Sequence, residues 1–268
     1  MQPAEQFPHY IEFRHLYKTF DRPVLVDSNF YVNAGETVAI IGRSGVGKSV
    51  TLSHIMGFLK PDQGRVIVAH QDITDMEEAE LRNIRRKVTM VFQNGALFDS
   101  LTIGENVGYS LIEHGHMPLD EVESRVRTML KRVGLDPEVI LDGLPAELSL
   151  GMQRRVAIAR AVAASDPLIM LYDEPTTGLD PISVETITDI IVRLRQELHV
   201  SGIVVTHEIP HALKVGNRFL FLYDRRVAFE GSAEELADSN VPELVRFLAP
   251  FKISLAQAFQ SFSEGNGT

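Results

Sequence analysis

The chain has 268 residues and a net charge of −10, and that charge has the wrong sign for binding nucleic acid, so no nucleic-acid partner is expected. The absence of cysteine excludes disulfides, thiolate metal sites and a cysteine nucleophile. No apolar run approaches the roughly 18 to 20 residues that a membrane-spanning helix needs.

The N-terminal part of the chain predicts a short antiparallel sheet followed by a buried strand. The first ten residues have neither the basic nor the apolar region of a secretory signal, so we expect a protein of the cytosol or of its face of a membrane. Apolar and polar residues alternate over Ile11 to Phe13 and Val24 to Val32, which favours antiparallel strands. The apolar run Thr37 to Ile41 predicts a buried strand, and a helix is expected from about Lys48.

Further along the chain, short apolar runs alternate with longer segments of helical spacing. Four runs predict buried strands at residues 66–69, 88–92, 168–172 and 202–206. This alternation predicts an α/β fold with a largely parallel sheet. Between Gln93 and about Ala164 the patterns are helical only, which indicates a helical insertion.

The last part of the chain predicts a hairpin, one helix and a tail. Residues 219–223 and 226–229 are expected to pair across a polar turn, and Val241 to Leu248 to form a helix. The segment from there to Thr268 is expected to fray.

A phosphate-binding loop is the strongest functional signal. Residues 42–49 read Gly-Arg-Ser-Gly-Val-Gly-Lys-Ser, which matches G-x-x-x-x-G-K-[ST] between a predicted strand and a predicted helix. Its glycines let the backbone wrap a phosphate chain, and the helix N-terminus adds partial positive charge. Lys48 is expected to reach the β- and γ-phosphates and the Ser49 hydroxyl to bind Mg2+. A glycine-rich turn that matches by chance is disfavoured by this context.

A second motif supplies carboxylates. The apolar run Leu168 to Tyr172 ends in Asp173 and Glu174. Asp173 is placed to hold Mg2+ directly or through water, and Glu174 to polarise the attacking water. Alone, this motif would be read as a charged turn; together with the phosphate loop it predicts a catalytic site.

Several weaker motifs, taken in order, resemble those of the nucleotide-binding subunits of ABC transporters, over about residues 10 to 235. Gln93 resembles the Q-loop glutamine, residues 148–152 (Leu-Ser-Leu-Gly-Met) the LSGGQ signature, residues 178–180 (Gly-Leu-Asp) the D-loop, and His207 the switch histidine. Phe20 lies where family members stack an aromatic ring on adenine. Alone, His207 would be read as a surface or capping residue and Phe20 as a core residue.

The resemblance implies an ATPase with a P-loop NTPase (RecA-like) core, an N-terminal antiparallel β subdomain and a helical ABC-signature subdomain at about 94–164. One ABC ATPase domain would cover residues 1–240. Residues 241–268 would be a C-terminal extension that either binds a partner or packs on its own subunit.

The resemblance also assigns roles to residues. ATP and Mg2+ are the expected ligands. The catalytic residues would be Glu174, His207, Gln93 and Lys48. The Mg2+ ligands would be Ser49, Gln93 and Asp173. The ATP contacts would be Phe20, Gly42, Arg43, Ser44, Gly45, Val46, Gly47, Lys48, Ser49 and Val50.

A head-to-tail homodimer is implied as well. Ser149 and Gly151 of one subunit would close over the γ-phosphate bound at Lys48 of the other, with Asp180 in the D-loop between them. Ser149 is placed to cap a helix that begins near Gly151. The chain departs from the family at Leu150, where the pattern has Gly, and at position 152, where Met replaces the usual Gln. A left-handed backbone at Leu150 would cost about 1 kcal/mol, so we expect a working but slower ATPase.

One stretch resembles a particular group within the family. Residues 92–107, and Met152 followed by Arg154 and Arg155, are similar to the ATPases of MCE-type (Mla-type) lipid transporters. This implies an ATPase at the cytoplasmic face of the inner membrane that energises phospholipid transport. Its partners would be an integral membrane permease, an MCE-domain protein and a small STAS-like accessory subunit. The apolar residues of the stretch either pack the helical subdomain or receive the permease's coupling helix.

Two alternatives stay open on the sequence. The first is the ATPase of an amino-acid or other small-solute importer, which would share every catalytic motif. The second is an ABC ATPase outside transport, as in DNA repair or translation. The single nucleotide-binding domain, the lack of zinc cysteines and the acidic charge disfavour the second alternative.

Overall fold

The computed structural model describes residues 7–113, 117–164 and 167–251, and its chain divides into two compact units. Unit 1 contains residues 1–81 and 201–268, and unit 2 contains residues 82–200. The expected fraying of the C-terminal tail concerns residues 252–268, which lie outside the described residues.

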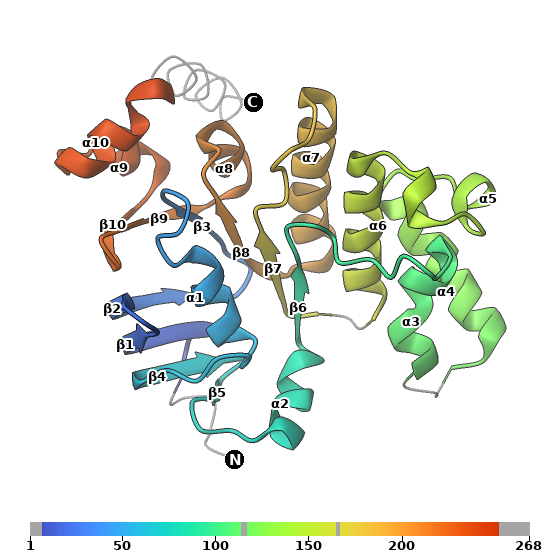
Figure 1. Cartoon of the computed structure of the whole chain (residues 1–268), viewed down its shortest axis with the longest axis horizontal. Helices are drawn as coiled ribbons and strands as arrows, with labels where there is room; N and C mark the ends of the chain where they lie inside the picture. The colour runs from blue at the N-terminus through green and yellow to red at the C-terminus, as the bar shows by residue number, and fades with distance from the viewer. Residues whose placement is uncertain (1–6, 114–116, 165–166, 252–268) are drawn as a thin grey trace. The chain divides into compact units, whose positions relative to one another are not determined.

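An antiparallel sheet forms the N-terminal part of unit 1. Its strand order is β2 (Pro23–Val32), β1 (Ile11–Thr19), β4 (Gln63–Val68) and β5 (Gln71–Asp72), and the first three lie side by side in Figure 1. In β1 and β2 buried residues alternate with more exposed ones along much of the strand, as the sequence pattern predicts, whereas the last three residues of β4 are all buried. The predicted N-terminal antiparallel strands are therefore confirmed.

A second group of strands in unit 1 carries the phosphate loop. Strand β3 (Thr37–Ile41) is parallel to β8 (Ser201–Thr206) on one side and to β9 (Arg218–Tyr223) on the other. Every residue of β3 and β8 is buried, which agrees with the apolar runs 38–41 and 203–205 inside these strands.

A hairpin ends this second group of strands, as the sequence predicts. Strand β10 (Arg226–Gly231) pairs antiparallel with β9. The turn residues Asp224 and Arg225 have φ values of 43° and 70°, the backbone that a tight two-residue hairpin needs.

The helices of unit 1 are α1 (Lys48–Ile55), α8 (Ile209–Val215), α9 (Ala233–Ala237) and α10 (Pro242–Leu248), and a 3-10 turn follows at Ala249–Phe251. Of these helices, α8, α9 and α10 pack on this second group of strands, whereas α1 contacts β4. Leu244 and Leu248 of α10 join a core cluster that includes Ile41 and Phe219 of the strands. The extension therefore packs on its own chain as far as residue 251.

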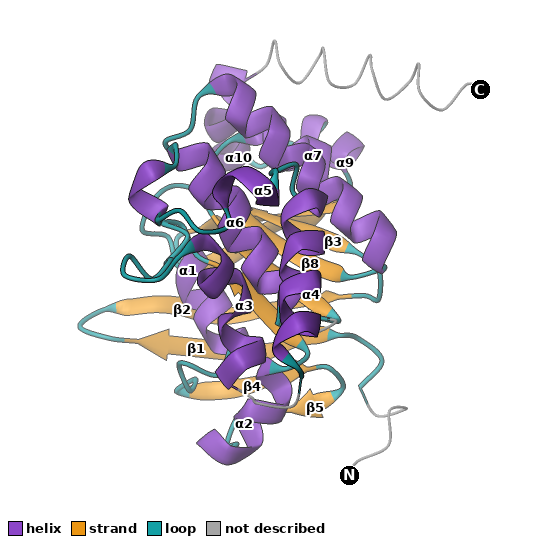
Figure 2. Ribbon diagram, turned by 90° about the vertical axis from the view of Figure 1, so that its right-hand side faces the viewer, coloured by secondary structure: helices purple, strands orange, loops and turns teal. Residues whose placement is uncertain are grey.

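Unit 2 combines two strands with the helical insertion. Strand β6 (Val88–Val91) is parallel to β7 (Ile169–Asp173). The helices are α3 (Ile103–Glu113), α4 (Leu119–Arg132), α5 (Pro137–Ile140), α6 (Leu150–Ala163) and α7 (Pro181–Leu198), with a 3-10 turn at Pro145–Glu147. Helices α3 and α4 lie side by side in Figures 1 and 2.

Two findings concern the helical insertion and the possibility of a membrane span. From Gln93 to Ala164 the described residues contain helices and turns but no strand. Among the described helices, none has the length and apolar character to cross a bilayer. Helix α2 (Glu78–Arg85) spans the boundary between the units.

A buried histidine on α1 gives unit 1 a pH-dependent stability. His54 is 1% exposed, its Nδ1 lies 2.8 Å from the carbonyl oxygen of Val50, and its Nε2 has no hydrogen-bond partner within the described residues. Burial lowers the pKa of His54; the nearby Lys18 lowers it further, while the Val50 carbonyl and Asp62 oppose the shift. The folded state therefore favours the neutral ring more strongly than the unfolded state does.

We expect the His54 contribution to be complete above pH 6.5, the unfolded value, and to be lost as pH falls toward the lower folded pKa. The measurement is the urea midpoint of the wild type and of His54→Leu between pH 8 and pH 5. The wild type should lose more stability on acidification than the variant. Parallel curves for the two proteins would contradict the assignment.

Candidate functional site

The phosphate loop of unit 1 connects β3 to α1 and is shaped by glycine. Gly42, Gly45 and Gly47 have φ values of 153°, 78° and 110°. A Cβ atom at Gly42 would lie 2.6 Å from the carbonyl oxygen of Leu222, too close for any side chain. The first turn of α1 contains no acidic residue, so its partial positive charge is not neutralised locally.

Lys48 folds back across this loop. Its Nζ donates to the carbonyl oxygens of Gly42 at 2.9 Å and Arg43 at 3.1 Å, and the residue is only 6% exposed. The amine therefore lies inside the loop, where a bound phosphate chain would meet it. Ser49, the next residue on α1, is exposed.

His207 follows β8 directly and lies at the same end of the parallel strands as the phosphate loop. Ile41 at the end of β3 pairs with Thr206 at the end of β8, so Gly42 and His207 follow neighbouring parallel strands. His207 is exposed. The carboxyl ends of parallel strands are the usual place for ligands in α/β sheets.

Phe20 lies in the turn between β1 and β2. It is 52% exposed, and the Nζ of Lys18 lies 5.5 Å from the centre of its ring. The reading of Phe20 as a core residue is therefore wrong. An exposed ring is available for stacking.

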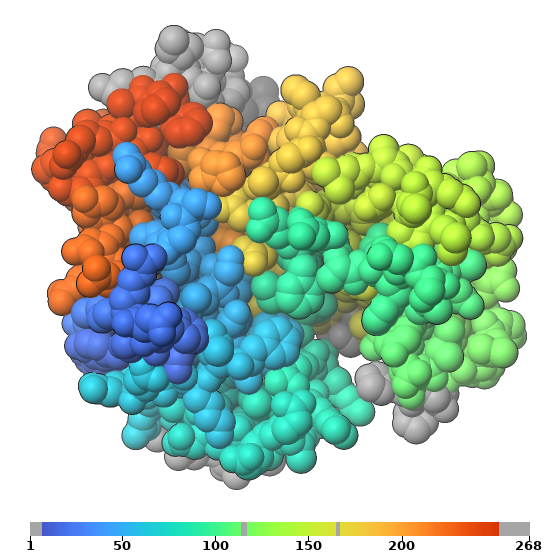
Figure 3. Space-filling model, viewed as in Figure 1, coloured from blue at the N-terminus to red at the C-terminus, as the bar shows by residue number. Residues whose placement is uncertain are grey.

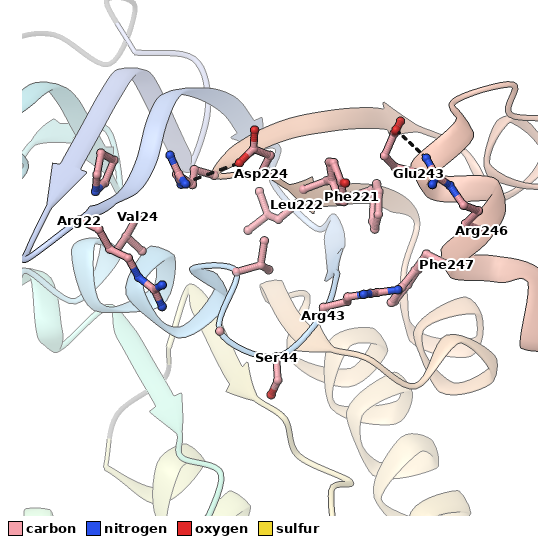
Figure 4. A pocket seen from close by; sticks show the side chains of 15 residues that line it. Arg22, Val24, Arg43, Ser44, Phe221, Leu222, Asp224, Glu243, Arg246 and Phe247 are labelled. Atoms are coloured by element: carbon pink, nitrogen blue, oxygen red, sulfur yellow. Dashed lines mark hydrogen bonds and ion pairs between the residues drawn. The ribbon is translucent and has the colours of Figure 1, made fainter.

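A pocket of about 470 Å3 lies beside the phosphate loop in unit 1. Its walls come from the β1–β2 turn, the loop, the β9–β10 hairpin and α10, and its lining includes Arg22, Val24, Arg43, Tyr223, Arg225, Arg246 and Phe247 (Figure 4). In Figure 4 the side chain of Arg43 extends toward α10. Figure 3 shows the blue surface of the loop segment bordering the red surface of the C-terminal helices.

Sequence reasoning missed most of this pocket. Of its lining, only residues 43–46 belong to a recognised motif. Arg22 and Phe247 are more than 200 positions apart in the chain. No local pattern signals that they share a cavity, because the fold alone brings them together.

The carboxylates of unit 2 lie at the end of β7. Asp173 and Glu174 are 8% and 7% exposed, which is unusual for acidic residues and agrees with a site rather than a solvated turn. Glu174 has a left-handed φ of 46°, and its Oε2 accepts a hydrogen bond of 3.2 Å from the Thr177 hydroxyl. Residues with such a strained backbone conformation are found mostly at functional sites.

Gln93 follows β6 at the same end of the two paired strands as these carboxylates. Val91, the last residue of β6, pairs with Tyr172 of β7. Gln93 and Glu174 therefore each lie two positions beyond a paired residue. Gln93 is exposed.

The signature residues form the start of α6. Ser149 is its N-cap, and the Ser149 hydroxyl accepts a hydrogen bond of 3.3 Å from the backbone N–H of Met152. A Cβ atom at Gly151 would lie 2.4 Å from the Ser183 hydroxyl oxygen, so packing against α7 also requires glycine there. This packing reason is independent of any ligand.

Leu150 corrects one expectation. It is the first residue of α6 and is not among the described residues with positive φ. The left-handed conformation and its cost are therefore absent, because a residue that follows an N-cap is helical. The Leu150 side chain instead lies next to Gly178 in the D-loop segment.

Because no backbone strain is relieved, Leu150→Gly should change ATP turnover by less than about threefold in the assembled complex. Turnover at saturating ATP, compared with the wild type, checks this. A sharp loss would show that the contact with the D-loop segment has its own role.

Asp180 begins α7. Its side chain accepts hydrogen bonds from the backbone N–H groups of Ile182 at 3.1 Å and Ser183 at 3.0 Å. Hydrogen bonding to Ser183 lowers the pKa of Asp180, so the carboxylate stays ionised. Helix capping thus fixes the end of the D-loop segment.

The donors expected around Mg2+ have suitable chemistry. Ser49, Gln93 and Asp173 offer hydroxyl, amide and carboxylate oxygens, the hard ligands that Mg2+ prefers. Among the described residues, no group of three or more histidines and carboxylates is placed to hold a metal. A site that relies on phosphate and water for its other ligands fits this composition.

A glycine-rich loop between a buried parallel strand and a helix, with carboxylates after another buried strand, defines a P-loop nucleotide-binding protein. The model of the ABC transporter family matches residues 25–177, and the chain belongs to this family.

Comparisons with known proteins support this membership over most of the chain. The chain is 38% identical over 239 residues to MlaF of Haemophilus influenzae, an intermembrane phospholipid transport system ATP-binding protein, and the match covers 89% of each chain. It is also 38% identical to the methionine import ATP-binding protein MetN of Caulobacter vibrioides, covering 84% of this chain and 68% of that one. The solved dimeric structure of the ATP-binding cassette MJ0796 in a post-hydrolysis state, bound to ADP and Pi, is similar to this chain with a TM-score of 0.77 and 36% identity. The match covers 83% of this chain and 98% of that one.

These findings confirm the resemblance to ABC transporter ATPases and to the Mla-type group. The chain is an ABC ATPase that binds ATP. The relative from a methionine importer matches over a smaller share of its length.

Proposed function

We propose that this chain is the ATP-hydrolysing subunit of an ABC transporter that moves phospholipid between membranes. The observation that carries the proposal is the similarity to MlaF over 89% of both chains. The shape of the phosphate loop and the buried Glu174 support an active enzyme rather than a binding module with a dead site.

In the proposed reaction, water attacks the γ-phosphorus of ATP in line with the bond to the leaving ADP oxygen. Lys48 and the N–H groups of the loop neutralise phosphate charge, and Glu174 orients the water or accepts its proton. Bound Mg2+ would supply further charge neutralisation through Ser49, Gln93 and Asp173. His207 would touch the γ-phosphate, and Phe20 would stack on adenine.

We propose that the active form is a head-to-tail homodimer. Ser149 and Gly151 of one subunit would face the ATP held by the other, and Asp180 would lie between subunits. The dimeric state of the similar cassette supports this arrangement. The capped start of α6 supports it as well, because a helix N-terminus favours a phosphate. ATP then stabilises the dimer by binding between its subunits.

The transporter partners are part of the proposal. The chain would bind an integral membrane permease at the cytoplasmic face of the inner membrane, in a complex with an MCE-domain protein and a small STAS-like subunit. Exposed apolar side chains of unit 2 support a docking surface for a permease helix; they are Phe92, Phe98, Tyr109 and Ile112.

A pull-down from membranes with lipid analysis tests the function. We expect the tagged full chain to co-purify with a permease, an MCE-domain protein and phospholipid. Phe98→Asp should reduce this recovery, whereas Phe58→Asp, a change at a similarly exposed phenylalanine of unit 1, should not. Recovery of a solute-binding protein system instead would favour a small-solute importer and contradict the lipid proposal.

A further inference from the structure

The loop that carries Gln93 is anchored by side chains from the helices of its own unit. We call residues 92–102, between β6 and α3, the Gln93 loop. Asn106 of α3 is fully buried and holds the far end of the loop: its Nδ2 donates to Phe98, Leu101 and Thr102 carbonyl oxygens at 3.0 Å each. The near end depends on α6.

Two arginines of α6 hold the near end of the Gln93 loop. Arg160 donates to the carbonyl oxygens of Gly95 at 2.8 Å and Ala96 at 2.7 Å. Arg154 donates from Nη1 to the carbonyl oxygen of Phe92 at 2.8 Å. The Phe92 carbonyl belongs to the peptide bond that joins Phe92 to Gln93, so Arg154 restrains the backbone of Gln93 directly.

The burial of Arg154 is costly and its contacts are few. The residue is 2% exposed, and its Nε has no hydrogen-bond partner within the described residues. Burial lowers the pKa of the Arg154 guanidinium. Replacing buried charged groups with apolar side chains of similar volume often leaves the folding stability of a protein unchanged or raises it. Folding stability therefore gives little reason for an arginine at this position.

Arg154 also lies on the helix that presents the signature residues. Helix α6 is capped by Ser149 and includes Gly151, and Arg154 lies three residues after Gly151. A rigid helix that carries both Gly151 and the anchor of Gln93 moves them together. Arg155, the next residue, faces elsewhere: its Nη1 donates to the Gly134 carbonyl oxygen at 2.8 Å.

We propose that Arg154 is a positioning residue that couples Gln93 to α6, so that Gln93 is placed for hydrolysis only when the signature end of α6 is in place. This inference rests on the proposed ATPase site. Arg154 acts through the Phe92 carbonyl and does not touch ATP. Its loss should therefore lower turnover and raise the Mg2+ concentration that half-maximal turnover needs, while ATP capture by the phosphate loop is kept.

The test compares Arg154→Met with Arg155→Met in the full chain, purified with its membrane subunits. Each variant keeps an aliphatic stem and loses a guanidinium that donates to backbone carbonyl oxygens, that of Phe92 for Arg154 and those of Val133 and Gly134 for Arg155. For Arg154→Met we expect kcat to fall about 10-fold or more, the Mg2+ concentration for half-maximal rate to rise, and ATP affinity to stay within about threefold. The melting temperature should be equal to or above that of the wild type. Arg155→Met should keep kcat within about twofold.

A conservative variant separates positioning from packing. Arg154→Lys keeps a charged donor and should recover part of the lost kcat. Unchanged kcat and Mg2+ dependence in Arg154→Met, or an equal loss in Arg155→Met, would overturn the coupling. A kcat loss that merely follows a lower melting temperature would also overturn it. If wild-type and Glu174→Gln complexes hydrolyse ATP equally, the proposed site itself fails, which is a different result.

Discussion

Glu174→Gln is expected to bind ATP as tightly as the wild type and to lose at least about 100-fold in turnover, because an amide cannot accept a proton from the attacking water. The substitution keeps the size of the side chain. The amide oxygen can still accept the hydrogen bond that Thr177 donates to Oε2 at 3.2 Å. Since Glu174 is 7% exposed, the change also removes a buried negative charge near the bound nucleotide, which should stabilise the ATP-bound dimer.

Three measurements check this prediction: ATP turnover, binding of a fluorescent ATP analogue, and the dimer fraction by size-exclusion chromatography with ATP. Glu185→Gln, a change at an exposed glutamate of α7, serves as the control and should behave as the wild type. Near-normal turnover of Glu174→Gln would remove Glu174 from the catalytic site.

Lys48→Ala should act one step earlier, on ATP capture. The charged Nζ lies inside the phosphate loop, within 2.9 Å of the Gly42 carbonyl oxygen, where it would meet the β- and γ-phosphates. A charge-assisted hydrogen bond contributes about 1.5 to 3 kcal/mol, so ATP affinity should fall about 10- to 100-fold. Turnover and ATP-dependent dimerisation should fall with it.

The control for Lys48→Ala is Lys60→Ala. Lys60 is an exposed lysine that pairs with Glu77 at 3.4 Å, outside the phosphate loop. Titration of the fluorescent ATP analogue should separate the two variants. If Lys48→Ala bound ATP normally but failed to hydrolyse it, Lys48 would act on the transition state only.

The bounds of a strand can be predicted from the sequence when its apolar pattern is unbroken. Strand β3 has the predicted bounds, Thr37 to Ile41, because all five residues are buried. Strand β1 extends to Thr19, six residues beyond the predicted Phe13. Its register shifts after Phe13, and His15 has a φ of 49°, so the alternation breaks where the strand continues.

The candidate site was predictable where a residue's role is local. The glycines of the phosphate loop and the cap by Ser149 follow from the neighbouring residues alone. The expectation of strain at Leu150 is wrong because it places the start of the helix near Gly151. With Ser149 as the N-cap, Leu150 is already the first helical residue. The pocket beside the loop and the anchoring of Gln93 by Arg154 depend on residues distant in sequence, which local patterns do not connect.

The packing of α10 sets the smallest piece of this protein that can be studied on its own. Leu244 is fully buried and Leu248 is 5% exposed, both against the strands that lead to the phosphate loop, and Phe247 lines the pocket. A shortened version that ends at residue 240 would expose this apolar surface and open one wall of the pocket. Deletions made to locate partner-binding sequences should therefore begin beyond Phe251, so that loss of a partner is not confused with damage to the nucleotide site.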